Sequence, residues 1–320
     1  MDNRLTKKRL SDFLAYEWLI ILGTIFAVIV ALELLYTTLA ARLSVGQQFK
    51  YYVDEDISVT SVYSIYNVLG IDIGENGKTF SYDVMSVESE NLNSSYNVLS
   101  IRLSVQEGDA IFTSSVEKED VGARAKAVAD GHPLYDMEGL LAGAKEYLSQ
   151  FTVTGGNIYD LNDYDEAVIR AYFDERMKGD NRYRNEEDKE AGRQLEIGRI
   201  KKLAKDTEDF EKFLNCGNGA LFYRYTRFEQ STELYPDEEY YKKGYDKQVE
   251  SGRENLIYGI NIAELKGGKN VSDYLKLAGS DSAENVVLML FDFSSYQYDL
   301  QFEAISFVDT LVREFSDILD

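Results

Sequence analysis

The stretch from Trp18 to Ala41 constrains this chain more than any other part of its sequence. It runs for 24 residues, WLIILGTIFAVIVALELLYTTLAA, with one charged side chain, Glu33. A helix rises about 1.5 Å per residue, so a helix of this length reaches across a hydrocarbon core of roughly 30 Å with some tilt. The sequence therefore predicts a transmembrane helix over residues 18–41.

The charges that flank this stretch predict its direction. Four basic residues precede it, at positions 4, 7, 8 and 9, and the next two follow at positions 42 and 50. Basic residues concentrate on the cytoplasmic side of a membrane span. We therefore expect a single-pass protein of the cell membrane, with a basic cytoplasmic segment over 1–17, the transmembrane helix over 18–41 and an extracellular domain over 43–320.

Two alternatives compete with a permanent anchor. Thr38 and Ala40 form a tolerable cleavage site before Ala41, as in a secretory signal peptide, but the apolar core of such a peptide spans about 7–15 residues. A buried helix of a soluble domain is the other alternative. Glu33 is either a polar contact to another membrane subunit or a carboxyl that reaches the outer interface.

The charge of the remaining chain excludes some partners. Residues 43–320 carry 29 basic and 52 acidic side chains, a net charge of −23. Nucleic acids and anionic lipid surfaces would be repelled by such a domain. The single cysteine, Cys216, excludes an intrachain disulfide, so the chain resembles a bacterial surface protein more than a eukaryotic secreted one.

Hydrophobic periodicity places strands and helices along residues 43–320. Strands are expected over 46–56, 79–87, 108–115, 220–228, 256–262 and 286–293, and the last of these is apolar on both faces, as in a central strand. Helices are expected over 62–69, 121–130, 136–148, 164–177, 186–214, 237–251 and 302–315. Residues 93–106 fit either a strand or a helix.

Strands separated by helices predict an α/β fold, with a mostly parallel sheet flanked by helices in three layers. If residues 93–106 form a strand, the N-terminal part becomes an antiparallel meander and the fold is α+β.

Few residues suggest catalysis. The one histidine, His132, lies in a Gly-Pro turn, and the acidic run 160–166 lacks the glycine of a calcium loop and fits helix capping better. No zinc-ligand spacing and no phosphate-binding glycine motif is present. We therefore predict no catalytic residue, no metal and no cofactor. Tyrosine clusters at 223/225, 240/241/245 and 296/298 fit either packing or a contact surface for carbohydrate or protein.

The order of several segments resembles a known family. FKYYVDEDI, FSYDVMSV and NVLSIRLSVQEGDAIFTSS, followed by HPLYDMEGLLAGAKEYL and LIYGINI, are similar to segments of the extracytoplasmic solute-binding proteins of bacterial ABC importers. The resemblance covers about half of the chain. It implies a domain that binds a small solute, and the short C-terminal part implies a reduced, one-lobed relative.

The likeness also implies where a ligand would bind. In an open α/β sheet a ligand lies beyond the carboxyl ends of the strands. This rule points to Asp54 and Glu55 after the first strand, and to Thr113, Ser114 and Ser115 after the third. Turn formation and helix capping are the alternative roles for all five residues.

These observations favour a non-enzymatic, membrane-anchored surface protein that binds a small solute or a neighbouring envelope protein, with a role accessory to a transporter as one option. A structural protein of the cell envelope and a membrane-anchored, carboxylate-dependent hydrolase are the alternatives.

Overall fold

The computed structural model describes residues 18, 22–35, 48–59, 86–92, 96–105, 107–292 and 302–319. The chain divides into two compact units, Met1–Ser44 and Val45–Asp320. The expected helix over 62–69, most of the expected strand over 79–87 and the tyrosines at 296 and 298 lie outside the described residues.

The prediction of a transmembrane helix over 18–41 is wrong. Residues 22–35 are helical. Among the described residues, no helix has the length and apolar character that a membrane crossing needs. Glu33 lies exposed on this helix.

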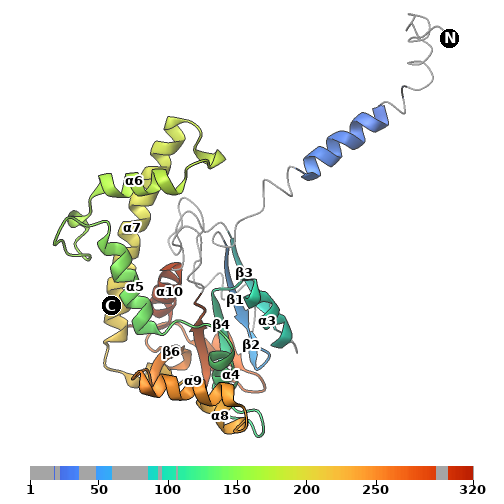
Figure 1. Cartoon of the computed structure of the whole chain (residues 1–320), viewed down its shortest axis with the longest axis vertical. Coiled ribbons are helices and arrows are strands. Elements are labelled where there is room, and N and C mark those ends of the chain that lie inside the picture. The colour runs from blue at the N-terminus through green and yellow to red at the C-terminus, as the bar shows by residue number, and fades with distance from the viewer. Residues whose placement is uncertain are drawn as a thin grey trace, which may run out of the picture. The chain divides into compact units, whose positions relative to one another are not determined.

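The second unit is built on a six-stranded sheet (Figure 1). The strands lie in the order β3-β1-β4-β8-β6-β5. Their bounds are Ser86–Asn91 for β3, Gln48–Val53 for β1, Ala110–Ser114 for β4, Val286–Leu290 for β8, Leu256–Asn261 for β6 and Phe222–Tyr225 for β5. A separate two-stranded sheet pairs β2 (Ile57–Val59) with β7 (Leu275–Leu277).

The sheet is mixed, which corrects the predicted mostly parallel sheet. β1 pairs in parallel with β3 and β4, whereas β8 runs antiparallel to both β4 and β6, and β5 runs antiparallel to β6. The antiparallel meander of the alternative prediction is also wrong, because residues Tyr96–Ser104 form a helix, α3, instead of a strand.

Successive side chains along each strand point to opposite faces of the sheet. They therefore divide the buried core into two clusters, one on each face. Tyr51 and Phe112 belong to the first cluster, while their neighbours Tyr52 and Ile111 belong to the second. All five residues of β8 are buried. The prediction of a central strand over 286–293 is confirmed, since β8 lies between β4 and β6.

Helices cover the two faces (Figure 1). Residues of α5 (Met137–Ser149), α7 (Glu186–Leu214) and α10 (Glu303–Phe315) pack in the first cluster, and residues of α3 and α4 (Arg124–Gly131) pack in the second. The predicted cap at Asp136 is confirmed, because its carboxylate accepts a hydrogen bond of 2.6 Å from the backbone N–H of Gly139. The helix expected over 186–214 has those bounds in the structure.

Three further helices complete the described part of the unit. α6 (Glu166–Arg176) packs against α7, and α8 (Glu229–Leu234) packs against α9 (Glu239–Glu250). The acidic run that precedes α6 has the capping role expected of it. Asp160 accepts from the N–H of Asn162 at 2.9 Å, and Asp165 accepts from the N–H of Ala167 at 2.9 Å.

A buried ion-pair network joins α6, α7 and α5. Glu196 is fully buried and accepts hydrogen bonds of 2.8 Å from both Arg176 and Arg199. Arg199 also donates to the Tyr147 hydroxyl at 2.5 Å and lies 3.8 Å from Glu303. Two guanidinium groups and two carboxylates thus neutralise one another, as buried charges require.

Candidate ligand-binding site

The carboxyl ends of β1 and β4 bring two of the predicted site residues together. The parallel pairing places Val53 opposite Phe112, so the residues that follow each of them lie at one edge of the sheet. The backbone N–H of Asp54 donates to the Phe112 carbonyl at 2.9 Å, and the Thr113 hydroxyl donates to Asp54 Oδ2 at 2.8 Å.

Asp54 is held as a buried, paired carboxylate. Its exposed fraction is 1%, and Arg124 at the start of α4 binds both oxygens, through Nη2 to Oδ1 at 2.9 Å and through Nε to Oδ2 at 3.2 Å. The N–H of Glu55 adds a third donor at 2.9 Å. A carboxylate this well satisfied orients Arg124 and leaves little capacity to hold a ligand.

The other predicted residues take different positions. The Ser114 hydroxyl accepts from the N–H of Val116 at 3.1 Å, and the Ser115 hydroxyl donates to the carbonyl of Asn285 at 3.3 Å. Both hydroxyls therefore stabilise the chain where it leaves β4. The half-exposed Glu55 carboxylate lies 3.9 Å from Arg124, so it adds negative charge at the same edge.

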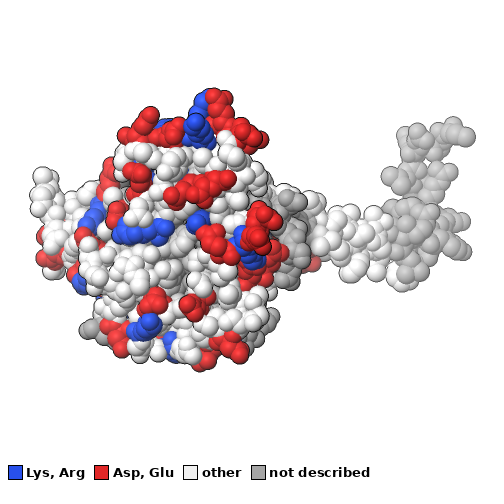
Figure 2. All heavy atoms as spheres, turned by 90° about the horizontal axis from the view of Figure 1, so that it is seen from below, with Lys and Arg blue, Asp and Glu red and all other residues white. Residues whose placement is uncertain are grey.

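Arg124 also lines a cavity of about 390 Å³ that lies between α4 and the α8–α9 pair. This pair lies at the sheet edge where β1 and β4 end (Figure 1). Its lining includes polar side chains and tyrosine rings, among them Arg124, Asp130, His132, Gln230, Ser231, Tyr235 and Tyr241. Figure 2 shows the same end of the molecule, with basic and acidic side chains scattered and uncharged surface between them.

Asp130 fixes the polar part of the cavity. This buried carboxylate accepts hydrogen bonds from the Tyr225 hydroxyl at 3.0 Å, from the Ser231 hydroxyl at 2.6 Å and from the Ser231 N–H at 3.1 Å. It also accepts from the N–H of Phe228. Burial, with the charge of Asp130, raises the pKa of Tyr225, so this hydroxyl stays protonated as a donor.

Gln230 joins the two sides of the cavity. Its Oε1 accepts from the N–H of Ala123 at 2.7 Å, and its Nε2 donates to the Ala123 carbonyl at 3.3 Å. Ala123 is the N-cap residue of α4, and its N–H has no acceptor within the helix, so Gln230 of α8 supplies one. The cavity is therefore built from groups that are already in place before any ligand arrives.

His132 is buried at the end of α4. Burial, with the charge of Arg227, lowers its pKa to about 4, so the imidazole is neutral at pH 7. Arg227 holds this segment by donating to the carbonyl of Ala129 at 2.7 Å and to that of His132 at 3.1 Å. A neutral imidazole in a fixed position offers a dipole to a ligand rather than a charge.

Aromatic rings form the exposed part of the site. Tyr235 is 52% exposed, and its ring centroid lies 5.8 Å from that of Tyr241. α9 has no buried residue, which makes packing an incomplete explanation for its tyrosines. Tyrosine rings stack on apolar faces while their hydroxyls bind polar groups.

Sequence reasoning missed Arg124, Asp130, Gln230 and Ser231. Arg124 lies 70 residues from Asp54, and Gln230 lies 107 residues from Ala123. No spacing in the sequence signals such contacts. Among the described residues, no group of three or more histidine, cysteine or carboxylate side chains could hold a metal ion, and Cys216 is exposed.

Comparison with known proteins gives no relative: no family model matches the chain, and neither a curated protein nor a solved structure shows significant similarity to it. The likeness to solute-binding proteins stays a prediction. The site is therefore interpreted from its own geometry.

Proposed function

We propose that residues 45–320 form a non-enzymatic domain that binds a small, neutral polar solute in the cavity between α4 and α8–α9. The observation that carries the proposal is a cavity whose polar groups are already fixed by internal hydrogen bonds and whose exposed part carries tyrosine rings. Its volume of about 390 Å³ lies within the usual range of small-molecule sites, roughly 300–1,000 Å³.

The charges of the cavity favour a neutral ligand. The negative charges of Asp54 and Glu55 offset the positive charge of Arg124. His132 is neutral at pH 7. The Asp130 carboxylate accepts hydrogen bonds from four donors of the protein itself. Dipoles that remain at the surface of the cavity suit hydroxyl and amide groups, and tyrosine rings suit the apolar face of a sugar or a small peptide.

The test is ligand-dependent stabilisation of the full chain against a panel of sugars, short peptides and cations. A ligand present at about 100 times its Kd stabilises a protein by about 2.7 kcal/mol, which a thermal melt detects. Binding of a neutral sugar or peptide supports the proposal. A flat response to the whole panel, or a response to cations alone, contradicts it.

Two tyrosine variants make the test specific. Tyr235→Ala removes a ring that lines the cavity and should weaken binding by about fivefold, because a well-placed aromatic contact contributes about 1 kcal/mol. Tyr240→Ala is the matched control: its ring belongs to the same cluster, 5.5 Å from Tyr241, but does not line the cavity. Equal losses of affinity in both variants would show that the ligand does not bind in the cavity.

A second candidate is an interaction module of a larger assembly. The exposed α9, with no buried residue and with Tyr240 on its surface, favours it. In that case Tyr240→Ala should lower the recovery of a specific partner in a pull-down with the full chain. Tyr235→Ala combined with Ala127→Leu, which fills the cavity, should leave that recovery unchanged.

A further inference from the structure

A second hollow lies at the far end of the α6–α7 pair. It has a volume of about 450 Å³ and is formed by the end of α6, the connecting segment with its short 3-10 helix Asn181–Tyr183, and the first two turns of α7. It shares no lining residue with the cavity between α4 and α8. The two sites can therefore be tested separately.

The charge of this hollow is opposite to that of the chain. Four basic side chains line it, Lys178, Arg184, Lys189 and Arg193, against two acidic ones, Asp174 and Asp180. The lining thus carries a net charge of +2 within a chain of net charge −22. The basic side chains of the lining favour an anionic ligand, although Glu175 and Glu186, which are not lining residues, lie near the two lysines.

The acidic side chains of the lining are directed toward particular arginines. Asp174 binds Arg193 at 2.8 and 2.9 Å in a two-pronged pair, and Asp180 binds Arg182 at 2.9 Å. Hydrogen bonds from Arg182 lower the pKa of Asp180 against the opposing effect of burial. Asp180 is therefore ionised at neutral pH, and both carboxylates are held in place by their arginine partners.

The two lysines are held much less tightly. Lys178 lies 3.8 Å from Glu175 with 77% of its side chain exposed, and Lys189 lies 3.9 Å from Glu186 with 41% exposed. Pairs this long and this exposed contribute little to stability. Either ammonium group can turn toward a ligand at small cost.

The floor of the hollow is apolar. Phe173 and Met177 are buried, and the Phe173 ring meets the Tyr183 ring edge to face, with centroids 5.0 Å apart. Gly192 makes this arrangement possible, because a β-carbon there would lie 2.3 Å from Phe173 and 2.7 Å from Tyr183. An apolar group of a ligand can rest on this floor while its charge meets the lysines.

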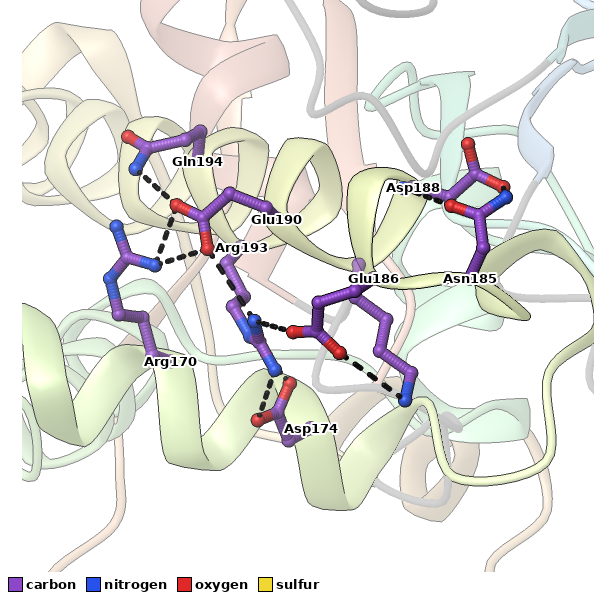
Figure 3. Close-up of polar contacts among 9 residues, drawn as sticks. Arg170, Asp174, Asn185, Glu186, Asp188, Glu190, Arg193 and Gln194 are labelled. Atoms are coloured by element: carbon purple, nitrogen blue, oxygen red, sulfur yellow. Dashed lines mark hydrogen bonds and ion pairs between the residues drawn. The ribbon is translucent and has the colours of Figure 1, made fainter.

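An ion-pair network holds the two helices in register. Figure 3 shows Arg170 and Asp174 of α6 pointing toward Glu190 and Arg193 of α7. Arg170 binds Glu190 at 2.7 Å, and Arg193 binds Glu186 at 2.6 Å. Hydrogen bonds from Arg170 and Gln194 lower the pKa of Glu190 to about 2, so this carboxylate is ionised at physiological pH.

We propose that this hollow binds a small molecule in which a phosphate monoester is joined to an apolar group. A phosphate monoester carries about −1.5 to −2 charges at pH 7, which matches the charge of the lining. The lysines and Arg184 face the phosphate, and the Phe173–Tyr183 floor receives the apolar part. The volume lies within the range of small-molecule sites.

Calorimetric titration of the full chain with phenyl phosphate tests the proposal. We expect saturable binding, weaker binding of inorganic phosphate, which cannot use the floor, and weaker binding of benzoate, which has a single charge. Absence of binding at millimolar phenyl phosphate, or equal affinity for benzoate, overturns the proposal.

Paired variants assign the site. The double variant Lys178→Ala/Lys189→Ala should weaken phenyl phosphate binding by about tenfold, because each lysine offers a charge-assisted hydrogen bond. Both side chains are solvent-exposed, so the fold should survive, and the melting temperature checks this. Lys243→Ala, which removes a lysine of α9 whose exposure is close to that of Lys178, should leave the affinity unchanged. An unaltered affinity in the double variant, or an equal loss in the control, overturns the assignment.

Discussion

Asp309 of α10 should make the stability of this protein depend on pH. The residue is 8% exposed and faces α7, where Asp206 and Asp209 are also buried. Burial, and then the charge of Asp206, raise its pKa from 3.8 to about 6, although Arg313 opposes the shift with hydrogen bonds of 3.0 and 3.2 Å. We chose Asp309→Asn because it keeps the shape of the side chain and removes its charge.

The direction of the pH dependence follows from comparing proton binding in the folded and unfolded states. The folded chain binds a proton at Asp309 more tightly than the unfolded chain does. The stability gained from this proton is fully present below pH 3.8 and is lost as the pH rises through about 6. A shift of about 2 pKa units corresponds to about 3 kcal/mol. The variant should therefore exceed the wild type in stability above pH 6, and its advantage should shrink as the pH falls toward 4.

Urea unfolding of both proteins between about pH 4.5 and about pH 7.5 measures this difference directly. Other carboxylates shift the stability of both proteins alike, so the difference curve isolates Asp309. Asp281→Asn serves as the control, because Asp281 is fully exposed and lies 3.3 Å from Lys276. A difference that stays flat with pH would refute the reasoning, as would a variant that loses stability relative to the wild type as the pH rises.

Three further substitutions test the packing. Arg199→Ala should cost about 3–5 kcal/mol, because it leaves the buried Glu196 carboxylate without a principal partner; a urea midpoint close to that of the wild type would contradict this. Gly259→Ala should cost about 1–3 kcal/mol by overpacking, since its β-carbon would lie 2.5 Å from Val287, and a melt at the wild-type temperature would count against it. Gly198→Ala, inside α7 with open space around the new methyl group, should raise stability by about 0.5–1 kcal/mol, and a lowered melting temperature would be the contrary result.

Local patterns in the sequence predicted several elements because short-range physics defines them. The α7 helix begins after Asn185, whose side chain accepts from the N–H of Asp188 at 2.8 Å, and acidic residues fill its first turn. Its apolar stripe then continues to Phe213. Likewise, β8 is apolar on both faces and is buried on both faces.

Pairing direction could not be predicted in the same way. β8 joins β4 and β6 from positions more than 170 and 25 residues away along the chain, and an apolar strand is compatible with either direction. The helix–strand ambiguity of residues 93–106 had a similar origin, because alternation and helical spacing coincide there. Leu99 and Leu103 are buried on one side of α3 while Ile101 is 64% exposed, which is the helical periodicity.

The apolar stretch at Trp18–Ala41 shows a different limit of sequence reasoning. Its length and composition predicted a span, but the described helix covers residues 22–35. In the part of the chain that the structure describes, no helix has the length and apolar character that a membrane crossing needs, so the length and composition of a segment alone do not establish a span. The location in the cell membrane and the roles considered for Glu33 stay predictions.

The contacts of the predicted site residues indicate where a ligand can bind in this acidic chain. The carboxyl-end rule brought Asp54 and Thr113 to one edge, yet their polar atoms bind each other and Arg124. Many carboxylates in the described part of the molecule act in the same way, as helix caps or as partners of arginine and lysine. Because acidic residues are abundant, most basic side chains have a carboxylate within ion-pair distance. Capacity for a ligand therefore lies where acidic residues are few or already satisfied: in the tyrosine-lined cavity beside α8 and in the basic hollow beside Lys178.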